Sequence, residues 1–375
     1  MSSPRIDVGM YVPAKPPLAG VEQLVSAAQQ LQFESVFIWD HVVDFFPQAI
    51  WDEEFTWLAN LSPSPHEWFD FQALLGYLAA KAPAVRLGVG VAEPIRRHPI
   101  LLAQTMLTLS HLCQRPPILG IGAGERMNTE PYGLPLSQAV SKLEEALQII
   151  RLAFTSQGPI NFQGKHFQLH DAVLDIQAPD GNMPEIWVAA HGPRMLQLTG
   201  QYGDGWYPVV VASPDDYAAR LEVIHSAATE AGRDPSTITP AFHPFVIVAP
   251  TEEEARAMLS TKAIRFSGLL FPAEVWQLFG LDHPLGGHFR GYIDFVPQAY
   301  DRKMLDDAIA QVPPAMIESL MWGTPEQIVA KLRAFGEAGL RHVVPLIVSA
   351  AVSEEAARFS VEAMTEIARA LQSGE

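Results

Sequence analysis

Short runs of apolar residues alternate along the chain with longer stretches whose apolar positions recur at helical spacing. The short runs are typical of strands, and the longer stretches are typical of amphipathic helices. Strands are predicted at 6–12, 35–40, 85–91, 117–122, 185–190, 204–208, 238–248 and 343–348. Helices are predicted at about 21–31, 70–82, 99–113, 143–154, 193–201, 214–231, 325–339 and 353–372.

The predicted strands favour a closed barrel over an open sheet. Runs such as 85–91 and 343–348 are apolar throughout, as expected of parallel strands that are covered on both faces. Eight such strand–helix units predict an α/β fold, a (β/α)8 TIM barrel that forms one domain over residues 1–375. Pro345 cannot donate to a strand ladder, so a local irregularity is expected in the last strand.

The helix at 325–339 carries the clearest local signals. Thr324 is a predicted N-cap, Pro325 occupies the first helical position, and Gln327 stands three residues after the cap. Gly339 is the predicted C-terminal stop.

Three stretches interrupt the alternation, at 42–69, 156–183 and 263–318. The first and the third are rich in aromatic residues, and the second contains strand-like fragments and a Pro/Asp/Gly-rich end. All three are interpreted as insertions after strands. The aromatic side chains of 42–69 and 263–318 are expected partly to form small cores of these insertions and partly to roof the barrel mouth.

Composition narrows the function. The chain has 375 residues, 48% of them hydrophobic and 18% charged, which is typical of a globular protein with a large core. Its formal net charge of −17 argues against nucleic-acid binding over a broad surface, but it leaves room for a local basic pocket. Cys113 is the only cysteine, which excludes an intramolecular disulfide and a Cys-based zinc site, and no metal-binding motif is found. No signal peptide or bilayer-spanning run is recognised, so a cytoplasmic location is expected.

Active sites of such barrels form just past the carboxyl ends of the strands. Asp40 and His41 follow the second strand, where a carboxylate and an imidazole could serve in proton transfer. Gly124, Glu125 and Asn128 follow the fourth strand in a tight loop. The alternative is structural: Asp40, Glu125 and Asn128 could cap loops, and His41 could be a packing residue.

Two further strand ends are candidates for ligand contact. Gly90 and Val91 end the third strand, where glycine permits a flat ligand to approach the backbone, although simple barrel packing is an alternative explanation. Ala190, His191 and Gly192 lead into a helix whose first N–H groups could bind a phosphate, or could form an ordinary strand–helix turn. The glycines around residue 122 do not match a dinucleotide-binding fingerprint.

Taken in order, these motifs resemble the luciferase-like superfamily, and in particular its branch that uses the deazaflavin coenzyme F420. The resemblance extends from about residue 5 to 372. Within that branch, the stretches 118–133, 185–196, 232–241 and 323–332 look most like the ketoreductases of phthiodiolone and phenolphthiodiolone dimycocerosates.

The resemblance implies roles for individual residues. It implies a non-proline cis peptide at Gly90-Val91 that backs the deazaflavin ring. Asp40 and His41 match positions at the deazaflavin and the active centre, and Glu125 matches an acid/base candidate. Gly124 belongs to the same loop, in which Asn128 matches a cofactor-holding position. Ala190, His191 and Gly192 match a turn near the cofactor's phosphate.

One departure from relatives that act on a sugar phosphate is informative. Those relatives have a phosphate-binding lysine beyond their Gly-Asp-Gly motif, whereas here 206–212 contains no cation. An apolar, possibly lipid-like substrate is therefore expected, and the resemblance favours a homodimer. The expected activity is hydride transfer between reduced F420 and a ketone or alcohol. The alternatives are an FMN-dependent monooxygenase of the same superfamily and a non-catalytic deazaflavin-binding protein.

Overall fold

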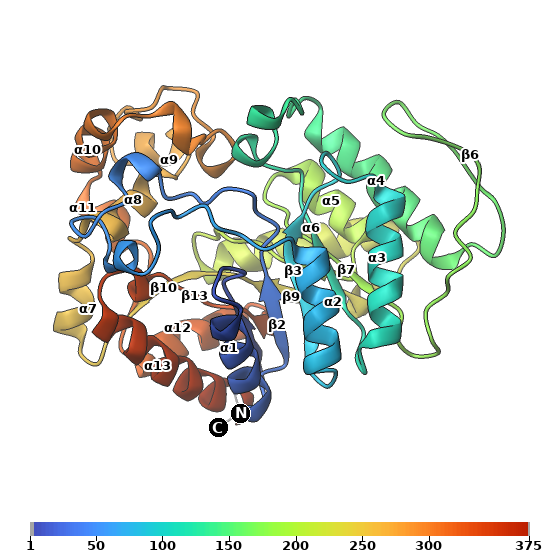
Figure 1. The fold of residues 1–375 in the computed structure, drawn as a ribbon, viewed down its shortest axis with the longest axis horizontal. Coiled ribbons are helices and arrows are strands. Elements are labelled where there is room, and N and C mark those ends of the chain that lie inside the picture. Colours follow the sequence, from blue (N-terminus) through green and yellow to red (C-terminus); the bar gives the residue numbers. More distant parts are fainter. Residues whose placement is uncertain (1–3, 374–375) are drawn as a thin grey trace.

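The computed structural model describes residues 4–373 and contains the predicted barrel (Figure 1). Eight parallel strands close in the order β1-β12-β9-β8-β7-β4-β3-β2. They are β1 (Asp7–Tyr11), β2 (Ser35–Ile38), β3 (Arg86–Ala92), β4 (Ile118–Ile121), β7 (Glu185–Val188), β8 (Gly205–Trp206), β9 (Thr239–Phe242) and β12 (His342–Val343). The (β/α)8 fold class is thus confirmed.

Helices surround the barrel and cover the outer faces of its strands. These are α1 (Leu18–Gln30), α2 (Phe71–Lys81), α3 (Pro99–Leu112), α4 (Ala139–Thr155), α5 (Pro193–Tyr202), α6 (Pro214–Glu230), α12 (Pro325–Glu337) and α13 (Glu354–Ser373). The capping box predicted for α12 is present: the N–H of Thr324 donates to Gln327 Oε1 (3.0 Å), and the N–H of Gln327 donates to Thr324 Oγ1 (3.4 Å). None of the helices within residues 4–373 has both the length and the apolar character needed to cross a membrane.

Two predicted strands are each divided at a proline, so the prediction of single strands at 238–248 and 343–348 was wrong. β9 ends before Pro244 and is followed by β10 (Phe245–Val248), and β12 ends before Pro345 and is followed by β13 (Leu346–Ile347). Because proline lacks an N–H group, it interrupts the ladder at both places. The irregularity expected at Pro345 is therefore confirmed. The two continuations pair with each other, and β11 (Met321–Gly323) completes a small separate parallel sheet.

Buried aromatic side chains fill the barrel interior. Phe37 from β2, Trp187 from β7 and Tyr207 after β8 pack in one cluster there. Gly205 provides space for the indole, because a Cβ atom at that position would lie 2.5 Å from Trp187 Cδ1. The interior is thus a packed core, and the chemistry has to lie at its rim.

The insertions lie on two sides of the barrel (Figure 1). Residues 156–183 contain an antiparallel hairpin of β5 (Ile160–Gln163) and β6 (Gln168–Ala172). Residues 42–69 contain the 3₁₀ helices η1 (Gln48–Ile50) and η2 (Trp57–Asn60). On the same side of the barrel lie α7 (Glu252–Met258), α8 (Lys262–Leu269), α9 (Ala273–Leu278), α10 (Arg302–Gln311) and α11 (Pro314–Glu318).

The aromatic insertions share a second hydrophobic core. Phe55 of the first insertion packs edge-to-face against Phe266 of the third, which in turn packs against Phe295. These buried rings hold residues 42–69 against 263–318 and thereby fix both segments above one side of the barrel.

Candidate active site

The predicted site residues lie at the ends of four strands that are neighbours in the barrel. Asp40 and His41 follow β2, Gly90-Val91 lies in β3, Glu125 follows β4, and the Ala190–Gly192 turn follows β7. The strand order runs β7-β4-β3-β2, and all of these pairs are parallel. The four ends therefore form one continuous arc of the barrel rim, although they are far apart in sequence.

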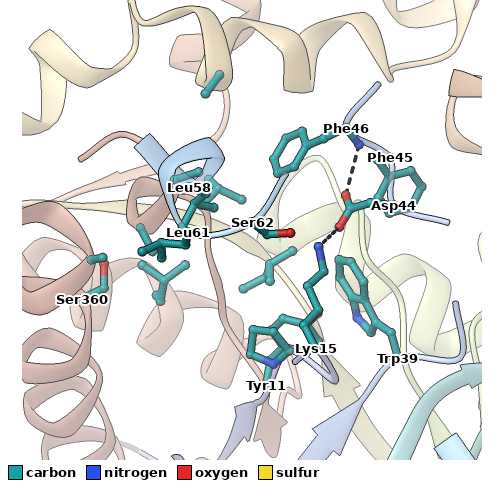
Figure 2. A pocket seen from close by; sticks show the side chains of 18 of the residues that line it. Tyr11, Lys15, Trp39, Asp44, Phe45, Phe46, Leu58, Leu61, Ser62 and Ser360 are labelled. Atoms are coloured by element: carbon teal, nitrogen blue, oxygen red, sulfur yellow. Dashed lines mark hydrogen bonds and ion pairs between the residues drawn. The ribbon is translucent and has the colours of Figure 1, made fainter. Parts of the chain in front are cut away.

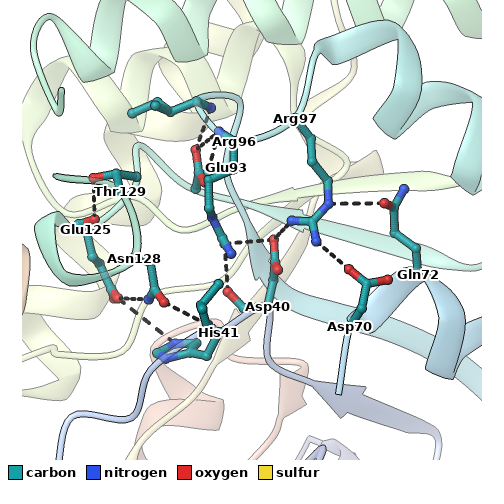
Figure 3. Close-up of polar contacts among 12 residues, drawn as sticks. Asp40, His41, Asp70, Gln72, Glu93, Arg96, Arg97, Glu125, Asn128 and Thr129 are labelled. Atoms are coloured by element: carbon teal, nitrogen blue, oxygen red, sulfur yellow. Dashed lines mark hydrogen bonds and ion pairs between the residues drawn. The ribbon is translucent and has the colours of Figure 1, made fainter. Parts of the chain in front are cut away.

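His41, Glu125 and Asn128 are brought together within this arc (Figure 3). His41 Nε2 lies 4.0 Å from Glu125 Oε2, and Asn128 Nδ2 lies 3.3 Å from the same carboxylate oxygen. The side-chain oxygen of Asn128 accepts hydrogen bonds from the N–H groups of Val42 (2.9 Å) and Val43 (3.3 Å). Asn128 thus ties the loop after β4 to the loop after β2, and it fixes the spacing between the imidazole and the carboxylate.

Burial sets the protonation states of this pair. It raises the pKa of Glu125 to about 7, against the lowering effects of the Asn128 hydrogen bond and the Arg96 charge. It lowers the pKa of His41 to about 4, although a hydrogen bond to the Val43 carbonyl acts in the opposite direction. At neutral pH the imidazole is therefore neutral, while the carboxyl group is close to its midpoint. Such a carboxyl group can either give or take a proton near neutral pH.

The tautomer of His41 follows from its backbone contact. Nδ1 lies 2.9 Å from the carbonyl oxygen of Val43, which can only accept a hydrogen bond, so Nδ1 carries the proton. Nε2 is then left with a lone pair on the side of Glu125. At 4.0 Å from Glu125 Oε2 this nitrogen is beyond hydrogen-bond distance, and neutral His41 has no proton to donate from it.

Asp40 is placed differently from its neighbour His41. Its carboxylate is buried between two guanidinium groups, with Oδ2 lying 3.0 Å from Arg96 Nη2 and 2.7 Å from Arg97 Nη1 (Figure 3). Burial raises the pKa of Asp40, while the two arginines act in the opposite direction. Arg96 also pairs with Glu93 at 2.5 Å and donates to the carbonyl of Asp40 at 2.8 Å. Asp40 thus anchors the end of β2 to the segment after β3.

Sequence reasoning missed the roles of Arg96 and Arg97. Their only local signal is a pair of adjacent cations shortly after a strand that ends at the rim. Their position in the sequence does not predict that both side chains contact the carboxylate of Asp40, which lies more than fifty positions earlier. Only the closed barrel brings these residues together.

The expected cis peptide is present between Gly90 and Val91. A Cβ atom at residue 90 would lie 3.0 Å from Phe37 Cδ1 and 3.1 Å from Tyr207 Cε1, so only glycine fits without displacing a buried ring. The Tyr207 hydroxyl lies beside this glycine and has no hydrogen-bond partner within residues 4–373. A smooth backbone surface with an unpaired hydroxyl behind it fits a flat polar ring at this position.

The turn after β7 fits an anion. Gly192 is the N-cap of α5, no side chain caps the helix, and a Cβ atom at residue 192 would meet nothing within 4 Å. His191 and Gly192 are exposed, whereas Ala190 is buried and its carbonyl accepts a hydrogen bond from Trp206 Nε1 (2.9 Å). Because Pro193 at the first helical position has no N–H group, the N–H groups of Arg194 and Met195 are the ones that can face a phosphate. Gly124, in the loop between β4 and Glu125, has a φ of +95°, which favours glycine.

Aromatic rings that were not among the predicted site residues surround His41. Trp39 stacks on the imidazole with ring centroids 4.9 Å apart, Phe45 meets it edge-on at 5.2 Å, and Trp68 lies at 5.4 Å. These rings exclude water from one side of the imidazole, which is why burial dominates its pKa.

An apolar cavity of about 510 Å³ begins at these rings (Figure 2). Trp39, Phe45 and Trp68 line it, together with residues from both aromatic insertions and from the segment 345–351. Within it, Lys15 pairs with Asp44 at 2.5 Å. Its volume lies within the range of about 300–1,000 Å³ that is typical of small-molecule sites. Residues 4–373 contain no group of three or more His, Cys, Asp or Glu side chains placed to hold a metal ion.

Comparisons with known proteins agree with this geometry. The family model described as luciferase-like monooxygenase matches residues 1–342. The chain is 36% identical over 361 residues to the phthiodiolone/phenolphthiodiolone dimycocerosates ketoreductase of Mycobacterium tuberculosis, covering 95% of this chain and 94% of the relative. The resemblance predicted from the strand-end motifs is therefore confirmed.

Two solved structures share the fold. One is an F420-dependent secondary alcohol dehydrogenase in complex with an F420-acetone adduct, with a TM-score of 0.75, 22% identity and coverage of 98% of this chain and 99% of that chain. The other is the coenzyme F420 dependent tetrahydromethanopterin reductase of Methanopyrus kandleri, with a TM-score of 0.72, 20% identity and coverage of 97% and 98%. By the family match and the identity to the mycobacterial ketoreductase, the chain belongs to the luciferase-like family of oxidoreductases.

Proposed function

We propose that the protein is a coenzyme F420-dependent oxidoreductase that transfers a hydride between the reduced deazaflavin and the carbonyl carbon of an apolar ketone. The observation that carries the proposal is the pairing of Glu125, a carboxyl group with a pKa of about 7, with a neutral His41 at the barrel rim. The names of the relatives support it: a ketoreductase by sequence and two F420-dependent enzymes by fold.

The rim offers a place for each part of the cofactor. Gly90-Val91 would support the ring, Asn128 lies beside that position on the next strand end, and the turn at Ala190–Gly192 would hold the phosphate. Reduced F420, when bound, supplies a hydride. FMN has a similar ring and phosphate, so the same arc fits it too, and the family's description as monooxygenase keeps it as the alternative cofactor.

Glu125 is the proposed general acid. In its protonated form it donates to the carbonyl oxygen and then gives up the proton as the alkoxide develops, so that the product leaves as an alcohol. In the direction of alcohol oxidation, the ionised carboxylate takes that proton back. A pKa near the working pH allows both states to be populated.

His41 and Asp40 position this acid. His41 keeps its Nδ1 proton on the Val43 carbonyl and places the unprotonated Nε2 4.0 Å from Glu125, so it packs beside the acid without competing as a donor. Asp40 holds the end of β2 through Arg96 and Arg97. We therefore assign proton transfer to Glu125 and positioning to the other two residues.

The apolar cavity beside His41 supports an apolar substrate. Lys15 and Asp44 neutralise each other there. Trp206 and Tyr207, which stand where sugar-phosphate relatives approach their phosphate-binding lysine, are fully buried aromatic residues. A charged substrate would find no counter-ion of its own at these positions. We further propose that the protein acts as a homodimer, on the family resemblance alone, and that it does so in the cytoplasm.

Anaerobic turnover tests this proposal. The protein is mixed with reduced F420 and a panel of ketones, and the return of the visible absorbance of oxidised F420 is followed. We expect ketone-dependent oxidation that falls by about a hundredfold or more in Glu125→Gln, in line with the usual contribution of a general acid. Oxygen consumption with reduced FMN, and no ketone reduction, would favour the monooxygenase. Tight binding of F420 without turnover of any ketone would favour a binding protein.

A further inference from the structure

The apolar cavity arises where two barrel strands diverge. β1 and β12 pair at Asp7–His342 and Val8–Val343, but beyond Pro345 the chain continues as β13, whose partner is β10. The cavity is lined by Met10 and Tyr11 at the end of β1 and by Leu346 and Ile347 of β13. It thus occupies the space that opens between the two strands, to one side of the polar arc.

One end of the cavity meets the candidate active site. Trp39 and Phe45 both line the cavity and both contact the His41 ring. A group that enters this end therefore comes to lie against the rings that enclose the imidazole next to Glu125.

The other end reaches the surface. Leu61 and Val361 line the cavity, yet 68% and 43% of their surfaces are exposed. Figure 2 shows Trp39 and Phe45 at one side of the cavity and Leu61 and Ser360 at the other. Leu61 follows η2 and Val361 belongs to α13, so an apolar mouth opens between these two elements, away from the polar rim.

Lys15, Asp44 and Ser360 on the cavity wall already have polar partners in the protein, whereas the buried indole N–H of Trp68 has none within residues 4–373. Lys15 Nζ contacts Asp44 at 2.5 Å and donates to the Pro65 carbonyl at 2.7 Å. The hydroxyl of Ser360 donates to the Ala356 carbonyl at 2.7 Å. The walls therefore offer hydrophobic contact to a guest and leave little for a charged group to bind.

We propose that this cavity is a channel for an extended alkyl chain of the substrate, with the carbonyl end beside His41 and Glu125 and the far end leaving through the mouth between Leu61 and Val361. The inference rests on the proposed ketone reduction and narrows its substrate class to ketones on long apolar chains. A chain longer than the cavity is accepted because the far end opens to the surface at Leu61 and Val361.

The test compares long and short 2-alkanones on variants of the mouth. Leu61→Glu and Val361→Glu place a charge at the exit, and Leu278→Glu is the matched control, since Leu278 is 83% exposed and does not line the cavity. Binding of 2-undecanone to the cofactor-free protein is measured by calorimetry, and kcat/KM with reduced F420 is measured for 2-undecanone and 2-butanone. We expect both mouth variants to lose about tenfold or more in affinity and kcat/KM for 2-undecanone, because apolar contacts are lost and a charge is desolvated. 2-Butanone turnover and the control should stay within about twofold of the wild type.

Other results would overturn the channel. An equal loss for both ketones, or no loss for either, would show that the chain does not pass this mouth. A change of oligomeric state in the mouth variants, seen by light scattering, would assign the face to a second copy of the chain. If no ketone is reduced at all, but 2-undecanone binds to the wild type and its binding is lost in the mouth variants, the channel stands and the proposed reaction fails.

Discussion

The Nε2 atom of His41 lies 4.0 Å from the Oε2 atom of Glu125, although the two residues follow different strands and are far apart in the sequence. Asn128 sets this spacing by bonding to both loops. The arrangement combines a neutral imidazole, a carboxyl group with a pKa of about 7, and an apolar cavity that begins at the rings around the imidazole. These are the elements that proton transfer to an apolar ketone requires.

The raised pKa of Glu125 predicts a pH-dependent stability effect that does not depend on any activity. Because its pKa is above the ordinary value when the protein is folded, the folded state binds the proton more tightly, and stability falls as the pH rises from about 4.5 through about 7. Glu125→Gln removes this loss and should stabilise the protein at pH 8 by up to about 3 kcal/mol, but little at pH 4.5.

Thermal unfolding of the wild type and the variant at both pH values measures this difference. Glu230→Gln, on an exposed position of α6, serves as the control and should show no such pH dependence. Equal unfolding temperatures of Glu125→Gln and the wild type at pH 8 would contradict the assignment.

Asn128 offers a way to move the pH profile of ketone reduction. The protonated acid is required, so the rate should fall as the pH rises through about 7. Asn128→Asp keeps acceptors for the N–H groups of Val42 and Val43 but adds a negative charge near Glu125, which should raise its pKa by roughly one unit. We expect the midpoint of the kcat profile to move to higher pH, whereas Asn161→Asp in the exposed hairpin should leave it in place. A midpoint that stays or moves down would argue against Glu125 as the acid.

Much of the fold could be predicted because it depends on local pattern. The apolar runs located the barrel strands, and the Thr324 capping box and the irregularity at Pro345 follow from rules that act within a few residues. Pro244 carried the same signal as Pro345, but it stood within a long apolar run, and the division into β9 and β10 was not predicted.

The site likewise contains features that the sequence predicts and features that it does not. The carboxyl ends of adjacent parallel strands lie side by side at one end of a barrel. His41, Glu125 and Asn128 could therefore be identified as neighbours. The ion pairs of Asp40 with Arg96 and Arg97 depend on how two loops pack and have no local pattern. The same holds for the cavity, since it exists because β13 leaves β1, which is a property of strand pairing.

Asp40 should act as a positioning residue. Asp40→Asn removes the charge that two partly buried guanidinium groups share, which should cost on the order of 3 kcal/mol of stability. The unfolding temperature and KM should therefore change, while the midpoint of the kcat profile should stay the same. A displaced or missing midpoint in a folded variant would instead make Asp40 part of proton transfer.

Gly192 should be needed for the cofactor and not for the fold. The space around its Cα is open in the protein, so Gly192→Ala should leave the unfolding temperature unchanged. If a phosphate approaches the N–H groups of α5 closely, the added methyl group should weaken F420 binding by about tenfold. Gly158→Ala, equally free of neighbours, is the matched control. Unchanged F420 affinity in Gly192→Ala would place the phosphate elsewhere.

F420-dependent hydride transfer is tested most directly by the equilibrium binding of oxidised F420 and of FMN to the purified protein, followed by fluorescence quenching. We expect tight binding of F420 and much weaker binding of FMN. A preference for FMN would contradict this expectation and make oxygen-dependent flavin chemistry the better explanation, and binding of neither cofactor would contradict hydride transfer at this site altogether.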